Sequence, residues 1–249
     1  MLGAKKLRQT GVQEVQITRV VAPITKYSKV VSSPGEVHEI LEEAYVLATN
    51  GRKGPVWIDV PLDVQGAPYI LGKNVFSKVV EDANCDLDID KIVGLLRGSQ
   101  KPLFFWGNGV KLDKATGDAA RLIETHGLPS VFSWNASDIL DYENKWNFGR
   151  PGVVAQRHAN FIVQKADLII SVGTSLDNVL TAYNPKNFAP GAKKIIINID
   201  ENQLLHCAIP NSLKVCTSAK NFIKKLNDHI SKNNYELNIQ PWIKECNHF

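Results

Sequence analysis

The chain of 249 residues lacks any apolar run near the roughly 18 residues that a membrane-spanning helix requires. Lys5, Lys6 and Arg8 follow Met1 without the apolar core of a signal peptide. We therefore expect no membrane partner and a cytoplasmic location.

Cysteine is also scarce. Cys85, Cys207, Cys216 and Cys246 are the only four, and no two of them have C-x-x-C spacing. His206 beside Cys207 is only a dipeptide, without a second pair at the spacing of metal ligands. These spacings argue against a zinc site and against a disulfide scaffold, so we assign no metal ligand and expect a reducing compartment.

Charge of one sign is not concentrated anywhere. The formal net charge is only +4 and the lysines are scattered, which does not favour nucleic-acid binding. No serine stands in a G-x-S-x-G context, so a hydrolase triad has no support. The hydrophobic content of 44% with 22% charged residues is typical of a globular protein with a sizeable core.

The first part of the chain contains one clear helix-to-strand unit. Ser33 and Pro34 are typical of a helix start, and apolar residues recur at helical spacing from Val37 until Asn50-Gly51. The loop Gly51–Pro55 then leads into the apolar run Val56–Val60, which predicts a buried strand. Before this unit, β-branched residues predict an extended segment over Val15–Ala22. After it, the periodicity disappears over residues 66–85, which indicates a linker.

A second unit begins near Asp86, where strand and helix patterns alternate. This alternation predicts an α/β fold with a doubly wound parallel sheet. The predicted strands are Pro102–Trp106, Ser130–Trp134, Leu168–Val172, Lys194–Ile199 and Lys214–Thr217. The predicted helices are Ile89–Leu96, Lys114–Thr125, Val153–Lys165, Ser218–Ile230 and a last helix near Pro241.

Gly107, Gly109, Gly173 and Asp200 all follow predicted parallel strands. Ligands of open α/β sheets bind at the carboxyl ends of the strands, and glycines allow backbone amides to approach a phosphate. Glycine is equally common in a strand-to-helix turn simply because the chain must turn. The dinucleotide fingerprint G-x-G-x-x-G is excluded, because Leu112 stands at its third glycine position.

Four segments together resemble one family. The stretch Gly51–Gln65 resembles the end of the pyrimidine-binding domain of thiamine-diphosphate enzymes of the acetolactate synthase type. Gly11-Val12-Gln13-Glu14, Trp106–Val110, and Gly173–Asp177 with Asn198–Asp200 resemble further segments of that family, in the same order.

The resemblance implies a domain organisation. Residues 1–65 would be the C-terminal part of a pyrimidine-binding α/β domain, and residues 66–85 a linker. Residues 86–232 would be a complete Rossmann-like central domain, and residues 233–249 the start of a linker to a diphosphate-binding domain. The chain thus resembles a fragment of a longer enzyme.

The resemblance also implies chemistry. The full-length parent would decarboxylate or ligate 2-keto acids with thiamine diphosphate and Mg²⁺, as a homodimer or homotetramer. Gln13, Glu14 and Lys26 would lie near its active centre. A nucleotide, FAD in the flavin-bearing members, would contact Arg52 together with the glycine edge of Gly107, Gly109, Gly173 and Asp200. Arg52 could equally pair with a surface carboxylate.

Departures from the family pattern limit these expectations. The family requires an early glutamate that activates thiamine diphosphate, for which Glu14 stands too late, and a Gly-Asp-Gly motif that binds magnesium, which is absent here. We therefore predict that this chain alone is inactive. Leu62 replaces the lysine of acetolactate synthases, and Val12 replaces a phenylalanine, so the substrate stays open. The alternatives are a non-catalytic module that binds FAD or an ADP-type nucleotide, and an architectural or dimerisation domain.

Overall fold

The computed structural model describes residues 15–68, 87–233 and 235–249, in two compact units that divide between Glu81 and Asp82. Gln13, Glu14, Cys85 and most of the predicted linker lie outside the described residues.

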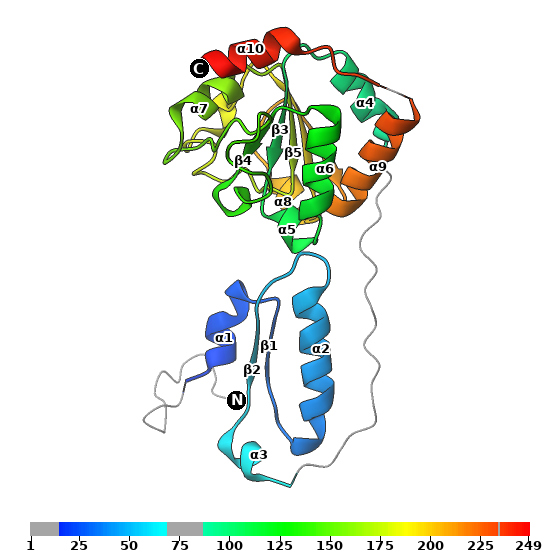
Figure 1. Cartoon of the computed structure of the whole chain (residues 1–249). Coiled ribbons are helices and arrows are strands. Elements are labelled where there is room, and N and C mark those ends of the chain that lie inside the picture. Colours follow the sequence, from blue (N-terminus) through cyan, green and yellow to red (C-terminus); the bar gives the residue numbers. More distant parts are fainter. Residues whose placement is uncertain (1–14, 69–86, 234) are drawn as a thin grey trace. The chain divides into compact units, whose positions relative to one another are not determined.

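The N-terminal unit is built around a parallel strand pair, β1 (Tyr27–Val30) and β2 (Val56–Asp59). Tyr27 is paired with Val56 and Val30 with Asp59. The predicted helix connects the strands as α2 (Val37–Thr49), after a 3₁₀ turn, η2 (Pro34–Glu36). Figure 1 shows α2 alongside the strands, with α1 (Ile17–Val21) on their other side.

Two expectations for this unit were wrong. Val15–Ala22 is not extended, because residues 17–21 form α1 and 22–24 the 3₁₀ turn η1 (Ala22–Ile24). The preference of residue types for strands spans only about 1 kcal/mol and depends on context, so packing of α1 against both strands overrides it. Strand β2 is only partly buried, since Trp57 is 42% exposed. Helix α3 (Leu62–Gly66) follows the strand.

The second unit has a five-stranded, wholly parallel sheet in the order β4-β3-β5-β6-β7. The strands are β3 (Pro102–Trp106), β4 (Ser130–Phe132), β5 (Leu168–Val172), β6 (Lys193–Asn198) and β7 (Ser212–Cys216). Every residue of β3 and β5 is buried, as expected for apolar strands covered on both faces. The predicted α/β class with a doubly wound parallel sheet is confirmed.

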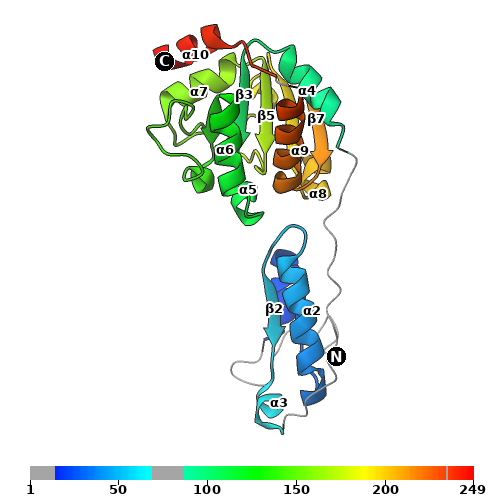
Figure 2. The same ribbon diagram turned by 45° about the vertical axis from the view of Figure 1, so that its right-hand side comes forward.

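Helices cover both faces of this sheet (Figures 1 and 2). One face packs against α4 (Ile89–Arg97), α6 (Thr116–His126) and α9 (Ala219–Lys232). The other packs against α7 (Arg157–Lys165), α8 (Glu201–His206) and α10 (Gln240–His248). A short helix, α5 (Gly109–Leu112), follows β3, and 3₁₀ turns lie at η3 (Trp134–Ala136) and η4 (Pro185–Asn187).

Several helix ends have the chemistry that their residue types favour. The hydroxyl of Ser218 accepts a hydrogen bond from the Asn221 backbone N–H at 3.2 Å and caps α9. Gly127 ends α6 in the left-handed conformation, with φ of 65°. By contrast, the Ser33 side chain makes no capping hydrogen bond.

Helix α7 begins at Arg157 rather than at Val153 as predicted. The Val153 backbone N–H donates to the Val179 carbonyl at 3.0 Å, which holds this segment as a loop. The Asn160 amide bonds both the N–H and the carbonyl of Gly152 at 2.8 and 2.9 Å, so tertiary contacts delay the helix.

Other boundaries shift by a few residues, and α8 was missed altogether. Strand β4 ends at Phe132, and Lys114 adopts φ of 55°, which separates α5 from α6.

No helix formed by the described residues has both the length and the apolar composition needed to cross a bilayer.

Candidate functional site at the carboxyl edge of the central sheet

The direction in which the chain adds strands to the sheet reverses between β3 and β5. From β3 the chain passes to β4 on one side, and β5 then returns to the other side of β3. Such a switch point is where open α/β sheets bind ligands. Gly107 and Gly109 follow β3, and Gly173 follows β5, so the structure brings the three predicted glycines together at this point.

The two turns contact each other through their backbones. The Gly109 N–H donates to the Gly173 carbonyl at 2.8 Å, and the Gly107 N–H donates to the Val172 carbonyl at 2.9 Å. A Cβ atom at Gly107 would lie 2.3 Å from the Gly173 oxygen and 2.4 Å from the Thr174 Cβ. Glycine is therefore required here by close approach of one turn to the other.

Asp200, the fourth predicted edge residue, caps a helix. Its carboxylate accepts from the Gln203 N–H at 3.2 Å, at the start of α8, and its own N–H donates to the Asn198 side-chain oxygen at 2.9 Å. The Gln203 side-chain oxygen accepts from Asn198 and from the Ser175 hydroxyl, each at 3.0 Å. These bonds join the ends of β5 and β6.

The segments that contain Ser175 and Asn198 were predicted at this edge from the resemblance, whereas Gln203 was not. The sequence does carry a signal for Gln203, because Asp200 followed three residues later by Gln203 has the spacing of a capping box. The link from Gln203 to Ser175 is a contact between distant segments, which no local pattern predicts.

A charge pair lies beside the glycine turns. Lys111 of α5 donates to both carboxylate oxygens of Asp138, in the loop after β4, at 2.8 Å. The hydrogen bond from Lys111 lowers the pKa of Asp138 below its usual value. The pair holds the α5 turn against that loop.

Lys26 and Arg52 belong to the N-terminal unit. The Lys26 ammonium donates to the Asn50 carbonyl at 2.8 Å, and its stem lies beside Gly54, where a Cβ would come within 3.1 Å of it. Lys26 therefore fixes the Gly51–Pro55 loop, on which Arg52 is exposed. Gln13 and Glu14 lie outside the described residues.

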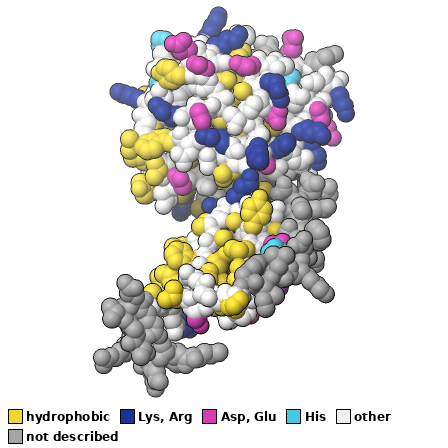
Figure 3. Space-filling model, turned by 60° about the horizontal axis from the view of Figure 1, so that its bottom comes forward, with side chains coloured by type: hydrophobic (Ala, Val, Ile, Leu, Met, Phe, Trp, Pro, Cys, Tyr) yellow, Lys and Arg dark blue, Asp and Glu magenta, His cyan; other side chains and the backbone are white. Residues whose placement is uncertain are grey.

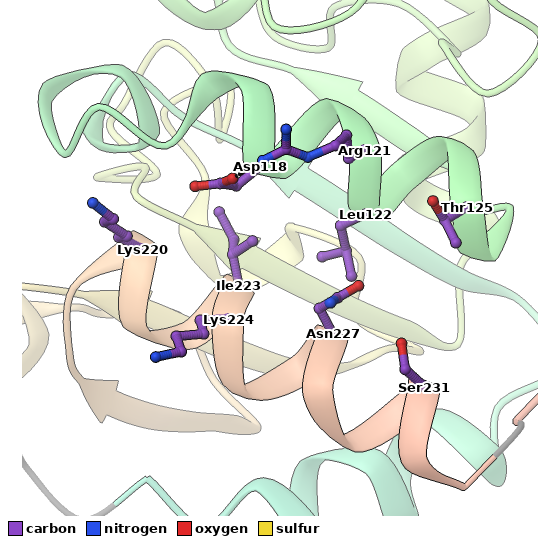
Figure 4. Close-up of a pocket in the computed structure, with 9 residues that line it drawn as sticks. All are labelled: Asp118, Arg121, Leu122, Thr125, Lys220, Ile223, Lys224, Asn227 and Ser231. Carbon is purple, nitrogen blue, oxygen red and sulfur yellow. Dashed lines mark hydrogen bonds and ion pairs between the residues drawn. The ribbon is translucent and has the colours of Figure 1, made fainter.

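A groove also runs between α6 and α9, with a volume of about 530 Å³. Figure 4 shows Asp118 and Lys220 near one end and Thr125 and Ser231 near the other. Leu122 and Ile223 form its apolar floor, and both are buried. The groove follows the helices rather than the switch point, so we do not take it as the candidate site.

Among residues 15–68, 87–233 and 235–249, no three His, Cys, Asp or Glu side chains gather as metal ligands would.

A family model described as the thiamine pyrophosphate enzyme central domain matches residues 89–226. The chain belongs to the thiamine pyrophosphate enzyme family. The match starts with α4 and includes all three glycine positions and Asp200, whereas Lys26 and Arg52 lie outside it.

Several curated relatives are acetolactate synthases. The chain is 30% identical to the isozyme 1 large subunit of Escherichia coli K12, over 77% of the chain and 34% of the relative. It is 26% identical to the probable large subunit of Methanococcus aeolicus, over 98% of the chain and 43% of the relative. It is 27% identical to the chloroplastic enzyme of Arabidopsis thaliana, over 94% and 36%.

The chain therefore spans between 34% and 43% of the length of these three relatives. The resemblance to acetolactate synthases that the sequence motifs indicated is confirmed. The domain boundaries and the site residues stay predictions.

The family raises the question of whether the residues present fit its cofactors. The sequence has no Gly-Asp-Gly segment, and the described residues offer no carboxylate cluster for a divalent cation, so this chain does not fit the diphosphate and metal by itself. The amides of the glycine turns donate to neighbouring carbonyls, so they do not fit the diphosphate of a flavin either.

Proposed function

We propose that this chain is part of a thiamine-diphosphate-dependent, acetolactate synthase-like enzyme that decarboxylates or ligates 2-keto acids. The observation that carries the proposal is similarity to acetolactate synthases over as much as 98% of the chain, with the same central domain. The chain contributes the end of a pyrimidine-binding domain over 1–65 and the central domain over 86–232, with linkers at 66–85 and 233–249.

Thiamine diphosphate and Mg²⁺ bind, in this proposal, to residues that another part of the assembly supplies. The lack of a Gly-Asp-Gly motif supports this division of labour. Thiamine diphosphate supplies the carbanion that attacks the keto carbon. A homodimer or homotetramer of the full-length protein forms the complete active centre.

Lys26, Gln13 and Glu14 approach that centre from the N-terminal unit. The resemblance of the segment Gly11–Lys26 to the family supports this role. The bond from Lys26 to the Asn50 carbonyl gives the ammonium a fixed place on the Gly51–Pro55 loop. Arg52 is exposed on the same loop.

The reducing, cytoplasmic setting is supported by Cys207 and Cys246, neither of which forms a disulfide within the described residues. A module whose purpose is to bind FAD is less favoured, because the N–H groups of Gly107, Gly109 and Gly173 donate to backbone carbonyls. The second candidate is a purely architectural role for the central unit. The fully buried strands β3 and β5 support it.

The test is to purify the native assembly that contains this chain and to measure pyruvate consumption with and without thiamine diphosphate and Mg²⁺. We expect consumption that depends on both in the assembly, and neither thiamine-diphosphate binding nor turnover by the 249-residue chain alone. A native assembly that binds thiamine diphosphate but turns over no 2-keto acid would overturn the proposed reaction. An assembly that binds none would favour the architectural role.

A further inference from the structure

The carboxyl edge of the central sheet carries the glycines that suggested a nucleotide site. We infer that this edge is closed by its own backbone, as a lock between the turns after β3 and β5, and that it holds no flavin or other dinucleotide. Hydrogen bonding, space and charge support this independently. The inference concerns the central unit and does not depend on the proposed reaction.

The first argument is hydrogen bonding. A diphosphate at a glycine turn needs backbone N–H groups that point at it. Here the Gly107 and Gly109 N–H groups donate to Val172 and Gly173 carbonyls, and the Gly173 N–H donates to the Ile197 carbonyl at 3.0 Å. The next amides, of Val110 and Lys111, close the turn internally at 3.1 and 3.0 Å. A bound phosphate would have to displace these bonds.

The second argument is space. A Cβ at Gly109 would lie 2.7 Å from the Gly173 Cα, and one at Gly173 would lie 2.9 Å from the Gly109 Cα. Each glycine thus leaves room for the other turn rather than for a ligand. Gly173 also has φ of 63°, a conformation that favours glycine.

The third argument is charge. No lysine or arginine occurs between Lys165 and Lys186, or between Lys194 and Lys214, and these stretches contain the turns after β5 and β6. The same turns carry acidic residues, Asp177, Asp200 and Glu201. A diphosphate would add further negative charge, which carboxylates oppose.

Three cations that follow β3 and β4 in the sequence have other partners or positions. Lys111 is paired with Asp138. Lys145 lies over the Trp146 ring, 5.0 Å from its centroid. Arg150 belongs to the loop after β4, which lies on the opposite side of β3 from β5.

The ligand arm of the test uses the full chain titrated with FAD, and separately with ADP, followed by flavin fluorescence and by thermal melting. We expect no saturable quenching and no ligand-dependent rise in Tm. Stoichiometric quenching, or a flavin that copurifies and resists dialysis, would overturn the inference. That result would leave the thiamine-diphosphate proposal standing, so the two failures are distinguishable.

The second arm asks what the glycines do without any ligand. Gly107→Ala and Gly109→Ala should each lower Tm by about 3–10 °C, because a methyl group meets backbone of the other turn. Gly117→Ala in α6 is the matched control, because a Cβ there meets nothing within 4 Å, and its Tm should stay level or rise. If Gly107→Ala fails to fold, the milder Gly109→Ala provides the measurement. Equal Tm for Gly109→Ala and the control would refute the lock.

Discussion

Lys194 lies on β6 with only 1% of its surface exposed, and its ammonium nitrogen has no hydrogen-bond partner within the described part of the chain. Its neighbours across the ladder are Ile169 on β5 and Ser212 on β7. Burial lowers the pKa of this side chain below its usual 10.5. The buried amine is therefore a cost to the folded state.

Lys194→Met keeps an unbranched apolar stem and removes the amine. We expect it to raise the free energy of unfolding by about 1 kcal/mol near neutral pH, because the desolvation penalty disappears. Lys193→Met is the matched control, since that neighbour is exposed and should change stability little. Urea denaturation of the wild type and the two variants measures their free energies of unfolding. A lower value for Lys194→Met than for the wild type would contradict the claim that the buried amine destabilises the fold.

The pH dependence of the same comparison is a separate prediction. Between the lowered pKa of folded Lys194 and 10.5, the unfolded chain binds more protons, so wild-type stability rises with pH across that window. The advantage of Lys194→Met should therefore be largest below the window and shrink as pH approaches 10.5. Denaturation at about pH 7 and about pH 10 tests this, and a constant advantage would show that the charge is not its cause.

At the scale of elements, the sequence predicted best what continuous apolar runs define. All five strands of the central unit occur, because runs such as Pro102–Trp106 are buried on both faces. Helix α1 was missed because its β-branched residues prefer strands only weakly, and contacts with β1 and β2 decide its state. Helix α8 was missed because it has only six residues, although Asp200 caps it.

For the candidate site, the sequence predicted which glycines lie together but not what they contact. Parallel strands place their carboxyl ends at one edge, so the grouping of Gly107, Gly109 and Gly173 followed from the strand assignment alone. That Gly107 faces the Gly173 carbonyl is a contact between distant segments, which no local pattern predicts. Our inference that the glycines serve each other rather than a ligand depends on this contact.

Helix α9 offers a test of capping at its N-terminus. Ser218→Ala removes the hydroxyl that accepts from the Asn221 N–H, and should cost about 1 kcal/mol of stability. Ser231→Ala, an exposed position on the same helix, should change stability little and serves as control. Chemical denaturation monitored by circular dichroism compares them, and similar midpoints would mean that Ser218 does not stabilise α9.

At the scale of the whole molecule, the two units differ in how much core they have. The N-terminal unit buries one small hydrophobic cluster, Val31, Ile40 and Val64, beneath a two-stranded sheet. Large hydrophobic side chains are exposed on it, as Figure 3 shows. They include Ile24, Leu41, Tyr45, Trp57 and Leu62. A pair of strands with so small a core is marginal in isolation.

The central unit has instead two extensive clusters, one on each face of its sheet, with Trp106 and Trp242 fully buried. Because local opening costs least where few apolar side chains are buried, the units should differ in amide exchange. We expect rapid exchange at β1 and β2 and strong protection at β3, β5 and β6. Exchange followed by mass spectrometry on the full chain measures this.

The same experiment distinguishes a fragment that lacks its neighbours from a self-sufficient domain. In the native assembly, the exposed apolar side chains and unpaired strand edges of the N-terminal unit should be covered, and β1 and β2 should gain protection while β3 and β5 change little. Uniform protection in the isolated chain would mean that the N-terminal unit is stable alone. The proposal that it is the end of a larger pyrimidine-binding domain would then lose its physical support.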